Sequence, residues 1–244
     1  MLDLVLVVLV FVGAVTQRLA GLGFSMLLSP FLVLLIGPQQ GVLVVNALAS
    51  IAAFIVAVRV WRDIDWHLLR WLMPPAVVTA LLGAGFSARS SNSALLIVIG
   101  SVSIVALAGS MLVKCLHVRV SGRIATVVAG AAAGITNATA GMGGPPITAY
   151  AILTNWPHRS FVATAQPLFL VLGSVSFCAK LSILPAGAPA WPAWMWCALA
   201  SSLLAGTTIG DTLAHRISST TIRVFVVTVA LAGAASVLWE GLFA

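Results

Sequence analysis

Two glycine-rich breaks in apolar sequence, 120 residues apart, constrain the fold of this chain more than any other feature. They cover residues 16–25 and 136–146, and four identities recur at one constant offset: Thr16/Thr136, Ala20/Ala140, Gly21/Gly141 and Gly23/Gly143. Glycine lets the backbone leave the helical conformation, and proline, as in Pro145-Pro146, favours the start of a helix. Within a membrane, unwound backbone survives only where protein or a water-filled cavity satisfies its polar groups. A matched pair of breaks in the two halves of a chain therefore points to the binding site of a transporter.

The composition places these breaks in a membrane protein. Hydrophobic residues make up 61% of the chain and charged residues 7%, and the mean hydropathy is +1.15, whereas soluble domains have about 45–50% apolar and about 25% charged residues. Helices satisfy their own backbone groups, so the predicted fold class is an all-α polytopic membrane protein. The segment Met1-Leu2-Asp3 lacks the basic flank of a signal peptide, so we expect the first apolar run to remain in the mature protein.

The apolar sequence divides into ten segments, five in each half. Segments 24–36 and 144–154 correspond to ~20 Å and ~17 Å of helix, too short for the ~30 Å of bilayer hydrocarbon. Each follows a break and is predicted to form a hairpin with the segment before it. Three full crossings after each hairpin make the second half inverted relative to the first. The prediction is thus two inverted repeats: residues 1–113 (hairpin 2–36, helices 40–58, 67–88 and 93–113), a basic cytoplasmic linker at 114–122, and residues 123–244 (hairpin 123–154, helices 160–179, 191–212 and 219–240).

The distribution of Lys and Arg predicts the orientation, because cytoplasmic loops are enriched in them. Only Arg89 and Lys180 are assigned to the outer side, and Arg18 to the tip of the first hairpin. We therefore expect both termini outside and four basic connections in the cytoplasm. These connections hold nine of the twelve Lys and Arg residues: Arg59, Arg62, Arg70, Lys114, Arg119, Arg123, Arg159, Arg216 and Arg223.

The second break carries a family resemblance. The run Gly134-Ile-Thr-Asn-Ala-Thr-Ala-Gly-Met-Gly-Gly-Pro-Pro146, together with its weaker N-terminal copy, resembles the TauE/SafE family of sulfite exporters. The likeness extends over essentially the whole chain. It implies a small bacterial inner-membrane transporter of duplicated architecture that moves sulfite, sulfoacetate or another organosulfur anion.

The breaks also favour an anion on physical grounds. A helix that begins after a glycine turn directs unpaired N–H groups and its positive dipole end toward the preceding turn. Starts near Ser25 and Gly144 are expected to converge on one site, where Arg18 offers a planar guanidinium to an oxyanion. Asn46 matches Gln166 at the same offset of 120. The predicted substrate-binding residues are Gln17, Arg18, Gly21, Gly23, Ser25, Asn46, Thr136, Asn137, Thr139, Gly141, Gly143, Gly144 and Gln166.

Each of these residue types also has a structural interpretation. Arg18 can reach the membrane interface or pair with backbone carbonyls. Asn46 and Gln166 can act as hydrogen bonds between helices, and the glycines as close-packing positions. The hydroxyls of Thr136 and Thr139 can bond to carbonyls of their own helix.

Other function classes fit the sequence less well. The four histidines lie in predicted loops without His-Glu-x-x-His spacing, and no Gly-x-Ser-x-Gly is present, so neither an enzyme, a metal site nor a cofactor is predicted. The net charge of +7 is scattered rather than clustered, which argues against nucleic acid. Cys115, Cys178 and Cys197 are an odd set without a disulfide framework. A passive anion channel, a transporter of another small anion and an assembly protein stay open as alternatives. The expected partners are a small anionic substrate and the lipid bilayer, and the sequence specifies no oligomeric state.

Overall fold

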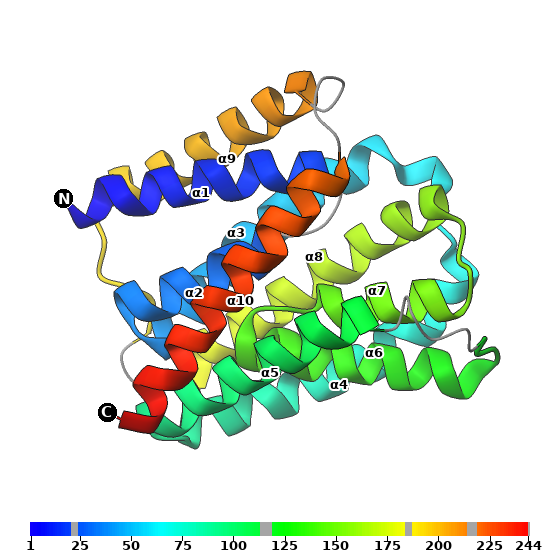
Figure 1. Ribbon diagram of the computed structural model, residues 1–244, viewed down its shortest axis with the longest axis horizontal. Coiled ribbons are helices and arrows are strands. Elements are labelled where there is room, and N and C mark those ends of the chain that lie inside the picture. Colours follow the sequence, from blue (N-terminus) through cyan, green and yellow to red (C-terminus); the bar gives the residue numbers. More distant parts are fainter. Residues whose placement is uncertain (21–23, 113–118, 184–186, 214–218, 244) are drawn as a thin grey trace.

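The computed structural model describes residues 1–20, 24–112, 119–183, 187–213 and 219–243 (Figure 1). All the regular structure among these residues is helical, which confirms the predicted fold class. In chain order the helices are α1 (Leu2–Ala20), α2 (Phe24–Ile36), α3 (Pro38–Arg59), η1 (Trp61–Asp63), α4 (Trp66–Arg89), α5 (Asn92–Leu112), α6 (Arg123–Ala140), α7 (Gly144–Leu153), α8 (His158–Ile183), α9 (Ala193–Leu213) and α10 (Ser219–Phe243).

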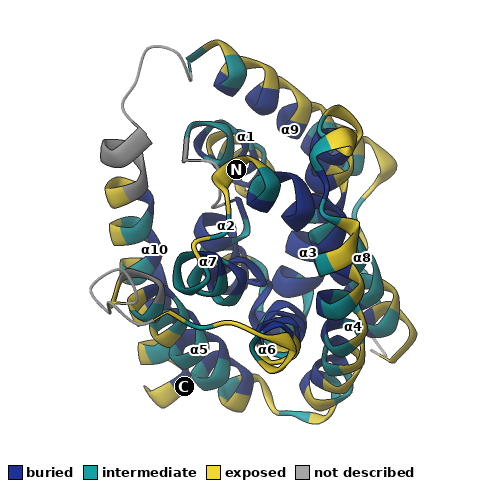
Figure 2. Ribbon diagram, turned by 90° about the vertical axis from the view of Figure 1, so that its right-hand side faces the viewer, coloured by how far each residue is buried: buried dark blue, intermediate teal, exposed yellow. Residues whose placement is uncertain are grey.

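Seven of the described helices are long and apolar enough to cross a membrane: α1, α3, α4, α5, α8, α9 and α10. Six of them correspond to the predicted full crossings, and α1 is the first arm of the N-terminal hairpin. The second arms are short, with 13 residues in α2 and 10 in α7. Exposed apolar side chains such as Phe54, Leu82 and Val105 cover the outside of the bundle. Figure 2 shows the buried residues on the inward faces of the helices, as expected for a protein surrounded by lipid.

The long arm of each hairpin packs against a helix from the other half of the chain. α1 pairs with α9 and α6 pairs with α4, while α3 packs on α8 and α5 on α10. Small residues permit this close approach. A Cβ atom added at Gly206 of α9 would lie 2.7 Å from the Phe11 carbonyl oxygen of α1, and one at Gly134 of α6 would collide with the Ala76 carbonyl of α4.

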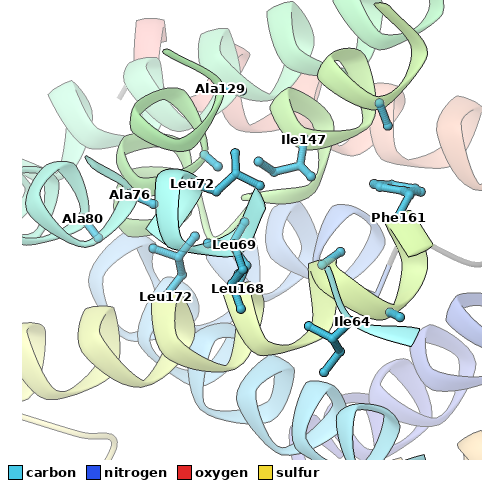
Figure 3. Packing of buried hydrophobic residues seen from close by; sticks show 14 of the residues in the cluster. Ile64, Leu69, Leu72, Ala76, Ala80, Ala129, Ile147, Phe161, Leu168 and Leu172 are labelled. Atoms are coloured by element: carbon cyan, nitrogen blue, oxygen red, sulfur yellow. The ribbon is translucent and has the colours of Figure 1, made fainter. Parts of the chain in front are cut away.

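The largest cluster of buried apolar side chains lies between α4, α6, α7 and α8. Figure 3 shows Leu69 and Leu72 of α4 beside Leu168 and Leu172 of α8, with Ile147 of α7 nearby. This cluster fixes the second hairpin against the rest of the bundle.

The described termini lie at one end of the bundle, and the connections α3–α4 and α7–α8 lie at the other (Figure 1). At the latter end Arg159 donates to Asp63 at 2.9 Å. Of the predicted linker, residues 114–118 lie outside the described residues. Its last part is tied to the second hairpin, since the Val120 N–H donates to the Leu153 carbonyl at 3.1 Å.

One boundary corrects the sequence interpretation. α8 continues to Ile183, beyond the predicted end at residue 179, so Lys180 is a helix residue and not part of an outer loop. Its side chain is 1% exposed. The prediction stopped the helix at the first charge because hydropathy alone does not show which face of a helix is covered by its neighbours.

Candidate functional site

A small cavity lies inside the bundle where the two short helices begin. Its volume is about 40 Å³, enough to hold a few waters. Six helices contribute to its walls, namely α1, α2, α3, α6, α7 and α8. The residues around it are Gln17, Phe24, Ser25, Met26, Ala49, Ala53, Asn137, Gly143, Gly144, Gln166 and Phe169.

The second break is built by one left-handed glycine. Gly141 has φ 68°, and its N–H donates to the Asn137 carbonyl at 2.9 Å. The Met142 N–H donates to the Thr136 carbonyl at 3.2 Å. These bonds satisfy the last carbonyls of α6 as the chain reverses. Because α7 then begins Gly144-Pro145-Pro146, and proline has no N–H, Gly144 supplies the free amide of the first turn at the cavity wall.

Two asparagines join the halves of the chain beside the cavity. Asn137 of α6 donates from Nδ2 to Asn46 Oδ1 at 2.8 Å and to Ser176 Oγ at 3.2 Å. Asn46 Nδ2 in turn reaches the Asn137 carbonyl at 3.4 Å. Asn46 is fully buried behind the cavity, whereas Asn137 lines it. Asn46 therefore orients a residue of the cavity wall rather than forming the wall itself.

Two glutamine side chains of the wall have unused hydrogen-bonding capacity. Gln17 Oε1 and Gln166 Oε1 are buried without a hydrogen-bond partner in the described part of the chain. Gln166 Nε2 donates only to the Val162 carbonyl of its own helix, at 3.1 Å. An unpaired buried polar atom costs about 1–3 kcal/mol, so groups of this kind call for a partner that the protein does not supply.

Arg18 has a protein partner that the sequence did not predict. Its guanidinium forms an ion pair with Asp211 in the last turn of α9, and Arg59 Nη1 reaches the same carboxylate at 2.9 Å. Arg18 is not among the cavity-lining residues. Two guanidiniums thus share one carboxylate at the ends of α1, α3 and α9, leaving one net positive charge there.

The remaining predicted residues divide between supporting positions and positions that the structure does not describe. Thr136 Oγ1 donates to the Ala132 carbonyl at 2.8 Å and Thr139 Oγ1 to Ile135 at 2.7 Å, both within α6. Gly21 and Gly23 lie outside the described residues. The structure brings six of the predicted residues together around the cavity: Gln17, Ser25, Asn137, Gly143, Gly144 and Gln166.

Sequence reasoning missed several residues at this site. Ser176 bonds to Asn137, and Ala49 and Phe169 line the cavity. Ala49 and Phe169 are separated by the same offset of 120 as the two breaks, so the repeat did carry a signal for this pair. Nothing in the local sequence marked Ser176.

A membrane-spanning helical bundle with a small polar cavity between two helix starts is the architecture of a membrane transport protein. A family model described as "Sulfite exporter TauE/SafE" matches residues 5–237, and the chain belongs to this family. The resemblance noted in the sequence is thereby confirmed, and the family is one of transporters rather than enzymes. No curated protein and no solved structure matches the chain.

Proposed function

We propose that this protein exports a small sulfur-containing oxyanion, sulfite or a short organosulfonate, across the bacterial inner membrane by alternating access. The observation that carries the proposal is the convergence of two helix starts and three side-chain amides on one buried cavity. Membership of the sulfite exporter family supports the substrate class.

The electrostatics of the cavity favour a negative charge. The starts of α2 and α7 both contribute residues to the wall, and a helix N-terminus carries roughly half a positive charge. No Asp or Glu is among the lining residues that the structure describes. An anion in the cavity therefore meets partial positive charge from two directions and no fixed negative charge.

Neutral groups complete the recognition. The amides of Gln17, Asn137 and Gln166 and the hydroxyl of Ser25 surround the space. Rotation of the Gln17 amide by 180° exchanges its acceptor for an NH₂ donor, which suits a deprotonated oxyanion. In the orientation present, the unpaired oxygens accept the proton of a singly protonated anion. A carrier of weakly acidic oxyanions benefits from side chains that can bind both the deprotonated and the singly protonated anion.

The helix pairing supports the inverted-repeat arrangement and a moving part. In the proposed repeats, α1, α3, α4 and α5 of the first half correspond to α6, α8, α9 and α10 of the second. The contact between α1 and α9 then corresponds to the contact between α6 and α4. The α3–α8 and α5–α10 contacts each join two corresponding helices. The cavity lies between the two hairpins, where rocking of one repeat against the other opens it alternately to each side.

The proposed orientation places the termini outside. The connections α3–α4 and α7–α8, which carry Arg62, Arg70 and Arg159 in or beside them, lie at the end of the bundle opposite the termini. An excess of basic residues at one end favours the cytoplasmic side.

Vesicles reconstituted with the purified protein and loaded with sulfite test the proposal. We expect saturable efflux of sulfite or a short sulfonate, and none of a sugar or a monovalent cation. Movement of a cation or neutral solute without any sulfur oxyanion would refute the function. Efflux that rises linearly with concentration and voltage, without saturation, would favour the passive anion channel instead.

A further inference from the structure

The second half of the chain contains a buried cation that the central cavity does not use. Lys180 of α8 is 1% exposed and is the largest fully buried side chain among the described residues. It makes no hydrogen bond or ion pair within that part of the structure. An unpaired ammonium in an apolar interior is strongly unfavourable, so a buried lysine either loses its proton or keeps its charge beside a counter-charge.

The helix register shows which residues lie opposite Lys180. Gly173 of α8 packs on Asn46 of the antiparallel α3, where an added Cβ atom would be 2.8 Å from the Asn46 carbonyl oxygen. Lys180 follows Gly173 by seven residues and Gln39 precedes Asn46 by seven. Seven residues are about two helical turns. Because α3 and α8 are antiparallel and in contact, Lys180 and Gln39 lie at about the same level of the bundle, about two turns from the Gly173–Asn46 contact.

Two further unpaired polar atoms belong to the same region. Gln39 Nε2 donates to the Ser87 carbonyl of α4 at 2.6 Å, which joins α3 to the end of α4. Gln39 Oε1 and the fully buried Ser87 Oγ have no partner among the described residues. α4 and α8 pack against each other, and Ala84 of α4 and Ala179 of α8 belong to the same buried apolar cluster.

The opposite end of the bundle provides a comparison for the group formed by Lys180, Gln39 and Ser87, which has no acidic partner in the described part of the chain. There the cations Arg18 and Arg59 are held by the carboxylate of Asp211. Asp63, Asp65 and Asp211 lie at that opposite end, paired with Arg159, capping α4, and paired with Arg18 and Arg59. Asp3 of α1 and Glu240 of α10 lie at the same end as Lys180, but both are exposed and belong to helices other than α3, α4 and α8. Among the described residues, α3, α4 and α8 provide an ammonium, an amide and a hydroxyl here, but no carboxylate.

We infer that Lys180, Gln39 and Ser87 form a second anion-binding site, distinct from the central cavity, which holds the transported oxyanion on its way to the side of the membrane where the termini lie. It is about 16 Å of helix rise from Phe169 at the cavity wall. The anion supplies the missing counter-charge, and Gln39 and Ser87 bond to its oxygens. This inference rests on the proposed anion transport.

Equilibrium binding of sulfite to the purified full-length protein, combined with vesicle transport, tests the site. The variants are Lys180→Met, Lys180→Arg and, as a matched control, Arg89→Met, which removes an exposed positive charge from the end of α4. We expect the wild type to show two binding events and Lys180→Met to lack one of them. Transport by Lys180→Met should show a KM raised by about tenfold or more with kcat within about twofold. Lys180→Arg and Arg89→Met should both resemble the wild type.

The outcomes separate this inference from the proposed function. Sulfite binding and transport by Lys180→Met equal to those of the wild type would overturn the second site and leave the function standing. Wild-type protein that binds sulfite at two sites without moving it would overturn the function and support the site. Absence of sulfite binding to the wild type overturns both. If Lys180→Met fails to fold while Lys180→Arg folds, the charge is structural and the second site is refuted.

Discussion

Asn137 of α6 donates a 2.8 Å hydrogen bond to Asn46 of α3, joining residues 91 positions apart at the edge of the central cavity. Asn137 also bonds to Ser176 of α8, so three helices meet at one side-chain amide. This junction holds the turn at Gly141, four residues later in the second break, in a fixed position relative to both halves of the chain.

Replacing Asn46 with alanine should therefore affect both stability and binding. The loss leaves one N–H of Asn137 without its acceptor, which costs about 1–3 kcal/mol of the free energy of unfolding. Anion affinity should fall as the Asn137 side chain loses its orientation. Ser50→Ala is the control, because the Ser50 hydroxyl bonds only within its own helix, at 2.7 Å from the Asn46 carbonyl. Denaturation in detergent and sulfite binding measure the two effects, and equal behaviour of the two variants would contradict the assigned role.

Gln166→Leu, in contrast, should weaken sulfite binding without lowering stability. The substitution removes a buried oxygen without a partner, so the free energy of unfolding should stay the same or rise by about 1 kcal/mol. Sulfite affinity should fall by about tenfold, because one polar group of the wall is lost. A variant with unchanged affinity and lower stability would show that Gln166 only connects helices.

The glycines at the start of α7 should tolerate little added volume. Gly143→Val is expected to abolish transport, since its Cβ would lie 3.3 Å from Asn137 Oδ1 and its methyl groups would enter the cavity region. Gly144→Ala is the milder comparison, because its Cβ meets only the flexible Met26 side chain, at 3.4 Å. Both proteins should be compared with the wild type by size-exclusion profile and sulfite efflux. Normal efflux by folded Gly143→Val would remove this backbone segment from the transport path.

Asp211→Asn should change transport more than stability. The side chains of Arg18 and Arg59 are 25% and 50% exposed, so solvent screens the pair and its contribution to stability is below about 1 kcal/mol. Release of the two guanidiniums should raise sulfite efflux at low salt, with a smaller difference at high salt. Asp63→Asn is the control, since its partner Arg159 is 84% exposed and Asp63 forms no ion pair with Arg18 or Arg59 among the described residues. If sulfite efflux depends on salt in the same way for the two variants, Arg18, Arg59 and Asp211 have no role in transport.

Membrane orientation can be tested by labelling single cysteines after replacement of the three native ones. A cysteine at Ser91, beside the start of α5, should react with an impermeant reagent from outside the cell. A cysteine at His158, at the start of α8, should react only after the membrane is opened. Labelling of both positions from one side would exclude the proposed inverted topology.

The sequence by itself determined the fold class, the family and the region of the cavity. These depend on properties of a single segment: hydropathy over about 20 residues, a glycine where the helix ends, and a proline where the next begins. The positions of Ser25, Gly143 and Gly144 at the cavity follow from such local signals combined with the repeat.

Only the tertiary structure decided which polar groups are free. Arg18 was predicted to be an anion ligand and bonds instead to Asp211, which is 193 residues away, because α1 packs along α9. Lys180 was assigned to a loop and is buried, because α8 continues past it between its neighbours. A local pattern shows that a charge is present on a helix, but its partner and its access to solvent depend on which helices pack beside it. That is decided by side-chain contacts between segments far apart in the chain.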